Sequence, residues 1–118
     1  MPTDVTIHGI KNCDTMKKAR AWLDEHRVEY AFHDYKSAGI DRATLGGWAR
    51  RLGWEVLLNR GGTTFRKLPD AEKANLTEAR AIDLMLAHPS AIKRPVITVG
   101  DTILVGFDPA RYATAFKA

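Results

Sequence analysis

Residues 4–35, DVTIHGIKNCDTMKKARAWLDEHRVEYAFHDY, carry the pattern that decides the fold. Polar and apolar residues alternate over residues 4–8, which predicts a short strand that Gly9 terminates. Residues 14–27 then space their apolar side chains as one face of an amphipathic helix does, and residues 29–35 favour a second strand. A strand–helix–strand unit of this length predicts two parallel strands joined by a crossover helix.

The last third of the chain returns to strands. Residues 95–99 and 102–105 are rich in β-forming types, and the Gly-Asp turn between them predicts an antiparallel hairpin. Asp108 followed by Pro109 is typical of the start of a helix, which closes the chain. A parallel pair with a crossover helix, followed by a hairpin and a closing helix, is the thioredoxin-like arrangement of the α/β class.

A helical insert, approximately residues 40–90, separates these two parts of a single predicted domain, 1–118. Asp41 is a good cap for one amphipathic helix, and Thr77 opens a second, longer one. Residues 59–67, NRGGTTFRK, lie between them and predict a polar, glycine-bearing loop.

The composition bounds the class of protein. With 118 residues, 45% of them apolar and 27% charged, the chain resembles one ordinary globular domain. No apolar run approaches the roughly 20 residues that a membrane helix needs, and no signal peptide is visible. A single cysteine excludes an internal disulfide and a cysteine-based metal cluster, and it is typical of a reducing compartment. We therefore expect a cytoplasmic monomer without a metal.

The charge balance bears on partners. A formal net charge of +4 is spread along the chain, without a block of like charges. This mild excess is typical of proteins that bind small anions, and nothing in it indicates a nucleic acid or a membrane surface. We expect neither of these two as a partner.

Cys13 lies between the first predicted strand and the first predicted helix. The unpaired N–H groups and positive dipole of a helix N-terminus favour a thiolate there. A thiol of pKa about 8.5 is only about 3% ionised at pH 7, whereas one lowered to about 6 is about 90% ionised. We therefore interpret Cys13 as a nucleophile, with the Thr15 hydroxyl within its reach; the alternative is a small buried side chain. Because Met16 replaces the second cysteine of a C-x-x-C pair, any disulfide chemistry needs an outside thiol.

Arginines supply candidate anion-binding groups. Arg94 precedes Pro95 at the start of a strand, where thioredoxin-like folds place a cis-proline beside the active thiol; the sequence leaves the isomer open. Arg60 and Arg66 lie in the glycine-bearing loop. Guanidinium groups that converge on a thiolate would bind an oxyanion bidentately, and solvated surface arginines are the alternative. His8 is either a structural histidine or a proton carrier for the thiol.

Four segments together resemble the arsenate reductase (ArsC) and Spx-related family, and its YffB-like branch most of all. They cover nearly the whole chain in the family's order. The segments are 9–19 (GIKNCDTMKKA), 54–68 (WEVLLNRGGTTFRKL), 83–89 (DLMLAHP) and 93–99 (KRPVITV).

The resemblance implies a thioredoxin-like fold with a helical insert and a catalytic cysteine, here Cys13. It implies that this cysteine attacks an oxidised substrate and is released by glutathione with the help of glutaredoxin, with no bound cofactor. In arsenate reductases three arginines bind the oxyanion: Arg94 falls on one position, Arg60 on or beside another, and Arg66 is a further candidate. Where the third is expected, residues 105–108 read VGFD instead. Arsenate and a mixed disulfide are therefore equal alternatives as substrate.

We predict a glutathione-dependent thiol reductase in which Cys13 is the nucleophile. The residues expected to bind the anion or shape the thiolate site are Arg94, Arg60, Arg66, Asn12, Asp14 and Thr15, with Pro95 as a structural residue there. The Spx side of the family gives an alternative, a redox-responsive regulator that binds the RNA polymerase α-subunit without catalysis. Its switch commonly relies on the C-x-x-C pair that Met16 removes. A third reading, a binding module for anions or glutathione, would tolerate Cys13→Ser.

Overall fold

The computed structural model describes residues 5–11 and 13–116, and the chain divides into two compact units. Met1–Ala38 and Arg94–Ala118 form the sheet unit, and Gly39–Lys93 form the helical unit. The helical unit therefore spans the residues for which the sequence predicts an insert.

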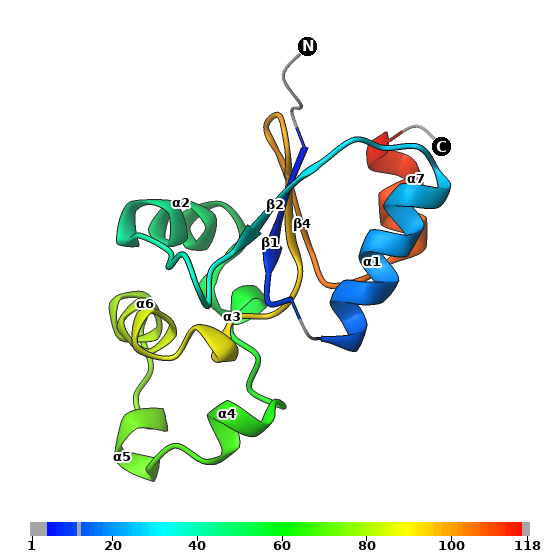
Figure 1. Cartoon of the computed structure of the whole chain (residues 1–118). Coiled ribbons are helices and arrows are strands. Elements are labelled where there is room, and N and C mark those ends of the chain that lie inside the picture. The colour runs from blue at the N-terminus through cyan, green and yellow to red at the C-terminus, as the bar shows by residue number, and fades with distance from the viewer. Residues whose placement is uncertain (1–4, 12, 117–118) are drawn as a thin grey trace. The chain divides into compact units, whose positions relative to one another are not determined.

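Four strands form one mixed sheet in the order β2-β1-β3-β4 (Figure 1). Central β1 (Val5–Gly9) runs parallel to β2 (Ala31–Asp34) and antiparallel to β3 (Val96–Val99). β3 then pairs antiparallel with β4 (Thr102–Val105). This is the predicted thioredoxin-like topology, and it is confirmed.

Helices α1 (Asp14–Glu25) and α7 (Pro109–Phe116) lie together on one face of this sheet (Figure 1). The apolar face predicted for α1 is its buried face, and α7 contributes a buried tyrosine. Alternate strand residues meet these helices, because successive side chains of a strand point to opposite faces. The resulting core consists of Val5, Ile7, Met16, Ala19, Leu23, Ile97, Leu104 and Tyr112.

The Asp108 cap of α7 has the predicted form. Its Oδ1 accepts hydrogen bonds from the backbone N–H groups of Ala110 and Arg111, at 3.2 and 3.3 Å. Two N–H groups of the first turn, which have no partner inside the helix, are satisfied in this way.

The helical unit contains five helices and one 3-10 turn. Asp41 accepts a hydrogen bond from the backbone N–H of Thr44 at 2.7 Å, and Thr77 accepts one from that of Arg80 at 3.3 Å, as N-cap residues do. Gly53 ends the first helix with φ 90°, a left-handed value that glycine adopts without strain. The elements are α2 (Arg42–Leu52), α3 (Trp54–Leu57), α4 (Thr63–Arg66), α5 (Asp70–Lys73), α6 (Glu78–Ala87) and η1 (Pro89–Ala91).

Three local predictions were wrong. β1 extends through Gly9, one residue beyond the predicted strand end, because Gly9 still pairs with Asp34 of β2. β2 is shorter than residues 29–35, since only Ala31–Asp34 pair with β1. The predicted loop 59–67 contains α4, a single turn of helix, although the glycines of that segment favour a loop.

Candidate active site

Three chain segments meet at one end of the sheet. Gly9 pairs with Asp34, so the segment that leads to Cys13 and the residue that follows β2, Tyr35, leave the parallel strands at the same end. β3 is antiparallel to β1, and its first residue, Val96, pairs with His8 near the same end of the sheet. Arg94 lies just before Val96 in the sequence. Topology therefore brings together residues that are far apart in the sequence.

Cys13 is the N-cap residue of α1 and is only partly buried. Its backbone is extended, with φ −136° and ψ 132°, and its carbonyl accepts the first helical hydrogen bond from Lys17 at 3.0 Å. This conformation leaves the sulfur beside the free N–H groups of the first helical turn. An anion at that position is also favoured by the positive end of the helix dipole.

The Cys13 thiol has a pKa below its ordinary value. Partial burial acts to raise the pKa, but polar groups around the sulfur outweigh it. They are the backbone N–H of Met16, the Arg94 guanidinium and the backbone N–H of Thr15, and the positive charge of Arg94 adds to their effect. The site therefore favours the nucleophilic, ionised form of the sulfur.

Arg94 is half-buried, and its backbone is fixed by the next residue. The Arg94–Pro95 peptide bond is cis, and Pro95 itself is buried. The carbonyl of Pro95 accepts a hydrogen bond from the backbone N–H of Gly106 at 2.8 Å, and Gly106 has φ 79°. The start of β3 is thereby tied to the end of β4, and Arg94 extends from an anchored backbone.

Tyr35 is the site residue that sequence reasoning missed. Its side chain is fully buried, at 0% exposure, and the Arg94 guanidinium hydrogen-bonds to its hydroxyl. Burial, the largest effect, raises the pKa of Tyr35 well above its ordinary value, and the nearby Cys13 thiolate raises it further against the opposing effect of Arg94. The only sequence signal was an aromatic residue at the end of a predicted strand, and we had interpreted it as part of that strand.

Other residues predicted near the sulfur have mixed outcomes. Thr15 contributes its backbone N–H, where the sequence had led us to expect its hydroxyl. Asp14 opens α1 with an exposed side chain, a favourable place for a negative charge. Asn12 lies outside the described residues. Their proposed roles toward a substrate stay predictions.

Arg60 and Arg66 belong to the helical unit and have exposed side chains. The guanidinium of Arg60 lies over the ring of Trp54, 5.8 Å from its centroid, and Arg66 ends the short helix α4. The carbonyl of Arg66 accepts a hydrogen bond from Lys73 at 3.2 Å. Their predicted role in anion binding is untested by these contacts.

His8 lies on the strand position between the buried residues Ile7 and Gly9, so it points to the opposite face of the sheet. Its Nε2 is 3.3 Å from Oγ1 of Thr98, and its ring meets that of His33 edge-on at 5.6 Å. Burial first, and then the neighbouring His33, lower the pKa of His8 to about 4. His8 is thus neutral at pH 7, which agrees with a structural histidine.

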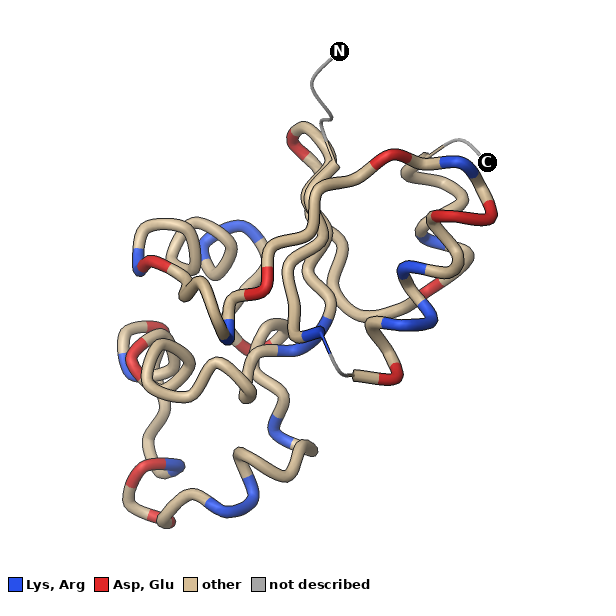
Figure 2. The backbone as a smooth tube through the Cα atoms, viewed as in Figure 1, with Lys and Arg blue, Asp and Glu red and all other residues tan. Residues whose placement is uncertain are grey.

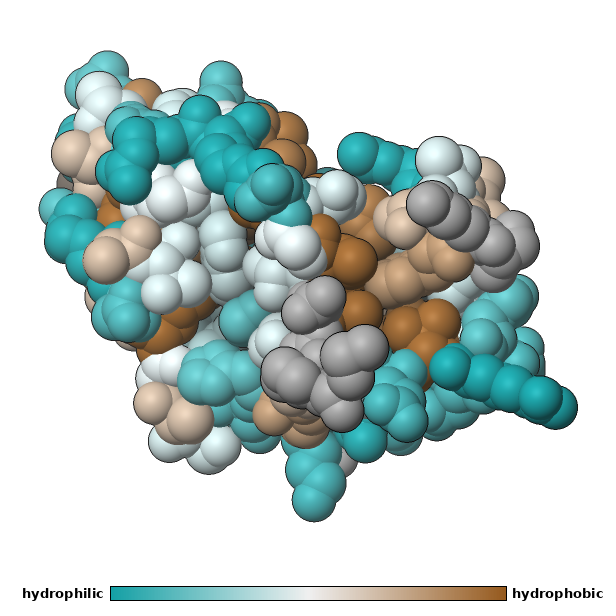
Figure 3. All heavy atoms as spheres, turned by 90° about the horizontal axis from the view of Figure 1, so that it is seen from above, coloured by the Kyte–Doolittle hydropathy of each residue, from teal (hydrophilic) through white to brown (hydrophobic). Residues whose placement is uncertain are grey.

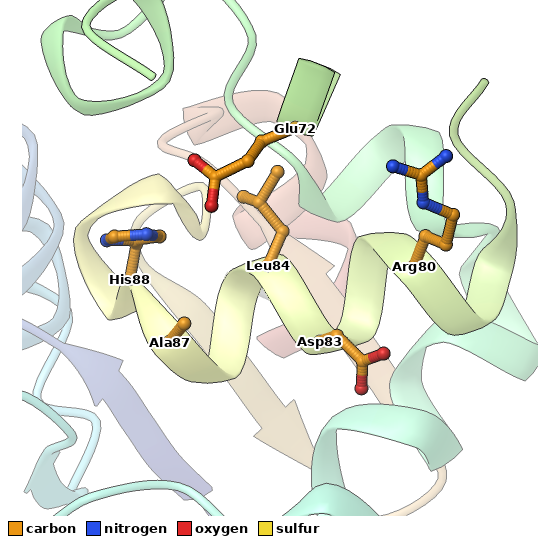
Figure 4. A pocket seen from close by; sticks show the side chains of 6 residues that line it. All are labelled: Glu72, Arg80, Asp83, Leu84, Ala87 and His88. Carbon is orange, nitrogen blue, oxygen red and sulfur yellow. The ribbon is translucent and has the colours of Figure 1, made fainter. Parts of the chain in front are cut away.

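A separate cavity of about 300 Å³ lies along α6, within the helical unit (Figure 4). Arg80 donates hydrogen bonds from its guanidinium to the carbonyls of Asn75 and Ala71, at 3.3 and 3.2 Å. Asp83 pairs with Arg42. Because these charged groups bind the chain itself, they are not available to orient a ligand in this cavity.

Charge and hydropathy are mixed over the surface. The basic residues of α1 lie between acidic residues at its two ends (Figure 2), and one face of the molecule intersperses hydrophilic and hydrophobic residues (Figure 3). Val56 is a large apolar side chain with 44% exposure, and single exposures of this kind are normal. No helix within residues 5–11 and 13–116 has the length and hydropathy that crossing a bilayer takes.

The fold and the site together define a thioredoxin-like protein with one activated thiol at a helix N-terminus. The chain belongs to the ArsC family, whose model matches residues 8–115.

Three relatives illustrate the range of this family. The chain is 62% identical to the YFFB (PA3664) protein, whose structure superposes with a TM-score of 0.92 over 94% of this chain and 97% of that one. It is 55% identical to an arsenate reductase (ArsC) related protein from Brucella melitensis, with a TM-score of 0.76 over 97% and 95%. It is also 29% identical to the global transcriptional regulator Spx of Streptococcus pyogenes, over 88% of this chain and 78% of that protein.

Proposed function

We propose that the protein is a glutathione-dependent thiol reductase of the cytoplasm, with Cys13 as its nucleophile and glutaredoxin as a partner. The observation that carries this proposal is the environment of the sulfur, where two backbone N–H groups and the Arg94 guanidinium stabilise a thiolate. An enzyme nucleophile needs this ionised form at neutral pH. Membership of a family that includes arsenate-reductase-related proteins supports the same chemistry.

With a mixed disulfide as substrate, the reaction is two thiol–disulfide exchanges. The Cys13 thiolate attacks the glutathione sulfur of the substrate, the substrate S–S bond breaks, and the released thiolate takes up a proton. A second glutathione, as its thiolate, then attacks the new disulfide on Cys13 and regenerates the enzyme. The substrate is reduced by two electrons, and glutathione leaves as its disulfide.

With arsenate, the thiolate forms a sulfur–arsenic bond and water leaves. Two glutathione molecules then supply two electrons and two protons, and arsenic passes from the +5 to the +3 state. The sulfur–arsenic bond breaks, which returns the Cys13 thiolate and releases arsenite, and glutathione disulfide forms. Arg94 would hold the oxyanion next to the sulfur, with Arg60 or Arg66 as the second clamp. Residues 105–108, at the end of β4 and just after it, contain no arginine where a third anion-binding arginine would be expected. The loss of one such group costs a few kcal/mol of anion binding.

The first experiment titrates the sulfur. The rate of alkylation of Cys13 by iodoacetamide is measured from pH 4 to 10, with Cys13→Ser as the blank. We expect a midpoint clearly below the free-thiol value of about 8.5. A midpoint at or above that value would remove the support for an activated nucleophile.

The second experiment separates the two substrates. Glutathione, glutaredoxin and the protein are incubated with either arsenate or a glutathionylated peptide, and arsenite or free peptide thiol is measured. Turnover of both with loss of both in Cys13→Ser supports the full proposal. Turnover of the peptide alone restricts it to a general thiol reductase, and no turnover of either contradicts it.

A second candidate is a regulator that binds the C-terminal domain of the RNA polymerase α-subunit, and its support is the 29% identity to Spx. Against a disulfide switch of that kind stands Met16, a fully buried core side chain in the place of a second cysteine. Titration of the purified α-subunit domain with this protein tests the candidate directly. Binding that persists in Cys13→Ser, together with absent turnover, would favour the regulator.

A further inference from the structure

Tyr35 has two anchors at the sheet end that carries the thiol. Its backbone N–H donates to the carbonyl of Gly9 at 3.1 Å, which extends the pairing of β1 and β2 by one residue. Its side chain is fully buried, and its hydroxyl is hydrogen-bonded by the Arg94 guanidinium. The same guanidinium hydrogen-bonds to Cys13. Arg94 therefore bridges a fixed phenol and the reactive sulfur.

We propose that Tyr35 is a positioning residue, whose buried hydroxyl holds the Arg94 guanidinium against the sulfur of Cys13. The proposal rests on the function proposed above, in which Cys13 is the nucleophile. Tyr35 takes no direct part in the bonds that form and break, and it acts through Arg94.

The chemistry of the three groups fits this role. An arginine side chain has several rotatable bonds, and holding it in one arrangement costs entropy unless a second contact fixes it. The guanidinium carries five N–H donors in a rigid fork, so it can serve the phenol and the sulfur together without competition. Burial keeps the Tyr35 phenol neutral, which leaves Cys13 as the anionic partner of the two.

The buried hydroxyl also needs its partner. Removing a buried hydrogen-bonding group from water without a partner costs about 1–3 kcal/mol, so the Tyr35 oxygen retains the guanidinium where it is. Phenylalanine at this position keeps the ring and its packing but releases Arg94. The arginine is then free to turn toward solvent.

The test is the pH profile of Cys13 alkylation by iodoacetamide in Tyr35→Phe. We expect the midpoint to rise by about half a pH unit or more, with alkylation at pH 7 slower by about threefold. The matched control is Tyr30→Phe, since Tyr30 is a partly buried tyrosine of the sheet unit whose hydroxyl accepts a hydrogen bond from another arginine, Arg20, at 3.2 Å. We expect that control to leave the midpoint unchanged.

A double-mutant cycle shows whether Tyr35 acts through Arg94. In an Arg94→Lys background the ammonium is a single point charge that cannot span both groups as the fork does, so Tyr35→Phe should add little further shift. If Tyr35→Phe folds poorly, the wild type is measured by NMR: slow hydrogen exchange at Nε of Arg94 supports the contact with the buried hydroxyl, and exchange as fast as that of the exposed Arg111 overturns the proposal.

The outcomes separate the two proposals. A low wild-type midpoint that Tyr35→Phe leaves unchanged, or shifts equally in the Arg94→Lys background, overturns the role of Tyr35 and leaves the thiol reductase intact. A low midpoint that shifts in the wild-type background alone supports it. A wild-type midpoint at the free-thiol value overturns both proposals together.

Discussion

The sheet unit and the helical unit hold their ionisable groups differently. In the sheet unit, His8, Cys13 and Tyr35 are partly or fully buried, and each has a pKa displaced from its ordinary value. In the helical unit, a displaced pKa belongs to Asp41, an exposed cap residue whose carboxylate accepts hydrogen bonds from Thr44. Burial displaces the pKa of His8 and Tyr35, whereas polar groups around the sulfur lower the pKa of Cys13 against the effect of burial.

Two ion pairs of the helical unit also lie at the surface. Asp83 pairs with Arg42 while both side chains are more than half exposed, and Lys73 pairs with Asp70 at 3.8 Å at the surface. Exposed pairs of this kind contribute about 0–1 kcal/mol, because water screens them. The predictions below test how far this contrast between the units extends.

The largest expected effect is on stability in acid, through His8. Its pKa of about 4 in the folded protein lies below the ordinary value of 6.5. The folded state therefore binds fewer protons than the unfolded state between these values, and the free energy of unfolding falls as the pH drops from 6.5 to 4. The full shift corresponds to about 3.4 kcal/mol, the loss is smaller than this because His8 is only partly buried, and the contribution is fully present above pH 6.5.

Urea unfolding at intervals from pH 7.5 to 4 measures this change. The difference between the wild type and His8→Gln isolates His8, because the carboxylates titrate alike in both. We expect the free energy of unfolding of the variant to fall less steeply as the pH drops. His33→Gln is the matched control at the neighbouring ring, and equal flattening in both variants would show that the pair and not His8 carries the effect.

Arg94→Ala should have the next largest effect, on the sulfur. Hydrogen bonds to charged groups contribute about 1.5–3 kcal/mol, so loss of the guanidinium should slow Cys13 alkylation at pH 7 by about tenfold or more. Arg111→Ala removes an exposed arginine of α7 and should leave the rate unchanged. Equal rates in the two variants would mean that the backbone N–H groups alone hold the thiolate.

Gly9→Ala tests the packing beneath the site. A methyl group at Gly9 would overlap the Sδ of Met16 and lie 2.6 Å from its Cε, and Met16 is fully buried. Overpacking of this kind costs about 1–3 kcal/mol. Chemical denaturation should show that loss, and a shift of Met16 should also raise the midpoint of Cys13 alkylation. A variant as stable as the wild type would show that the Met16 side chain finds another rotamer.

Gly47→Ala is the counterpart in the helical unit and should act in the opposite direction. Gly47 lies inside α2, and a methyl group there would meet no atom within 4 Å. Alanine in a helix interior is about 0.5–1 kcal/mol better than glycine, so the free energy of unfolding should increase. A loss of stability in this variant would contradict the open space at this position.

Periodic patterns explain how much of the fold could be predicted. The alternation before Gly9, the helical spacing after it and the short turn at Gly100 are local, and they determine the strands and α1 without knowledge of the rest. The turn of helix at Thr63–Arg66 was missed because it is too short to show a period.

The candidate site also combines features with a local sequence signal and features that depend on distant residues. The lowered pKa of Cys13 could be predicted because part of it depends on the helix that begins at the next residue, a local signal. The contact of Tyr35 with Arg94 could not be predicted, because the two residues are distant in the sequence and come together only through the pairing of β2 and β3 with β1. Arg60 and Arg66 remain predictions for a similar reason, since a function in anion binding depends on groups outside their own unit.

The smallest expected effect on the thiol belongs to Arg60→Ala and Arg66→Ala. Both side chains are exposed, and an exposed charge in water contributes about 1 kcal/mol or less even at close range. Each variant should therefore change the rate of Cys13 alkylation at pH 7 by less than about twofold. If either arginine clamps the anion of a bound substrate, the same variant should raise the KM for arsenate while leaving the alkylation profile in place. A raised alkylation midpoint in Arg60→Ala would instead place that guanidinium among the groups that stabilise the thiolate, and the contrast between the two units would no longer hold for arginine.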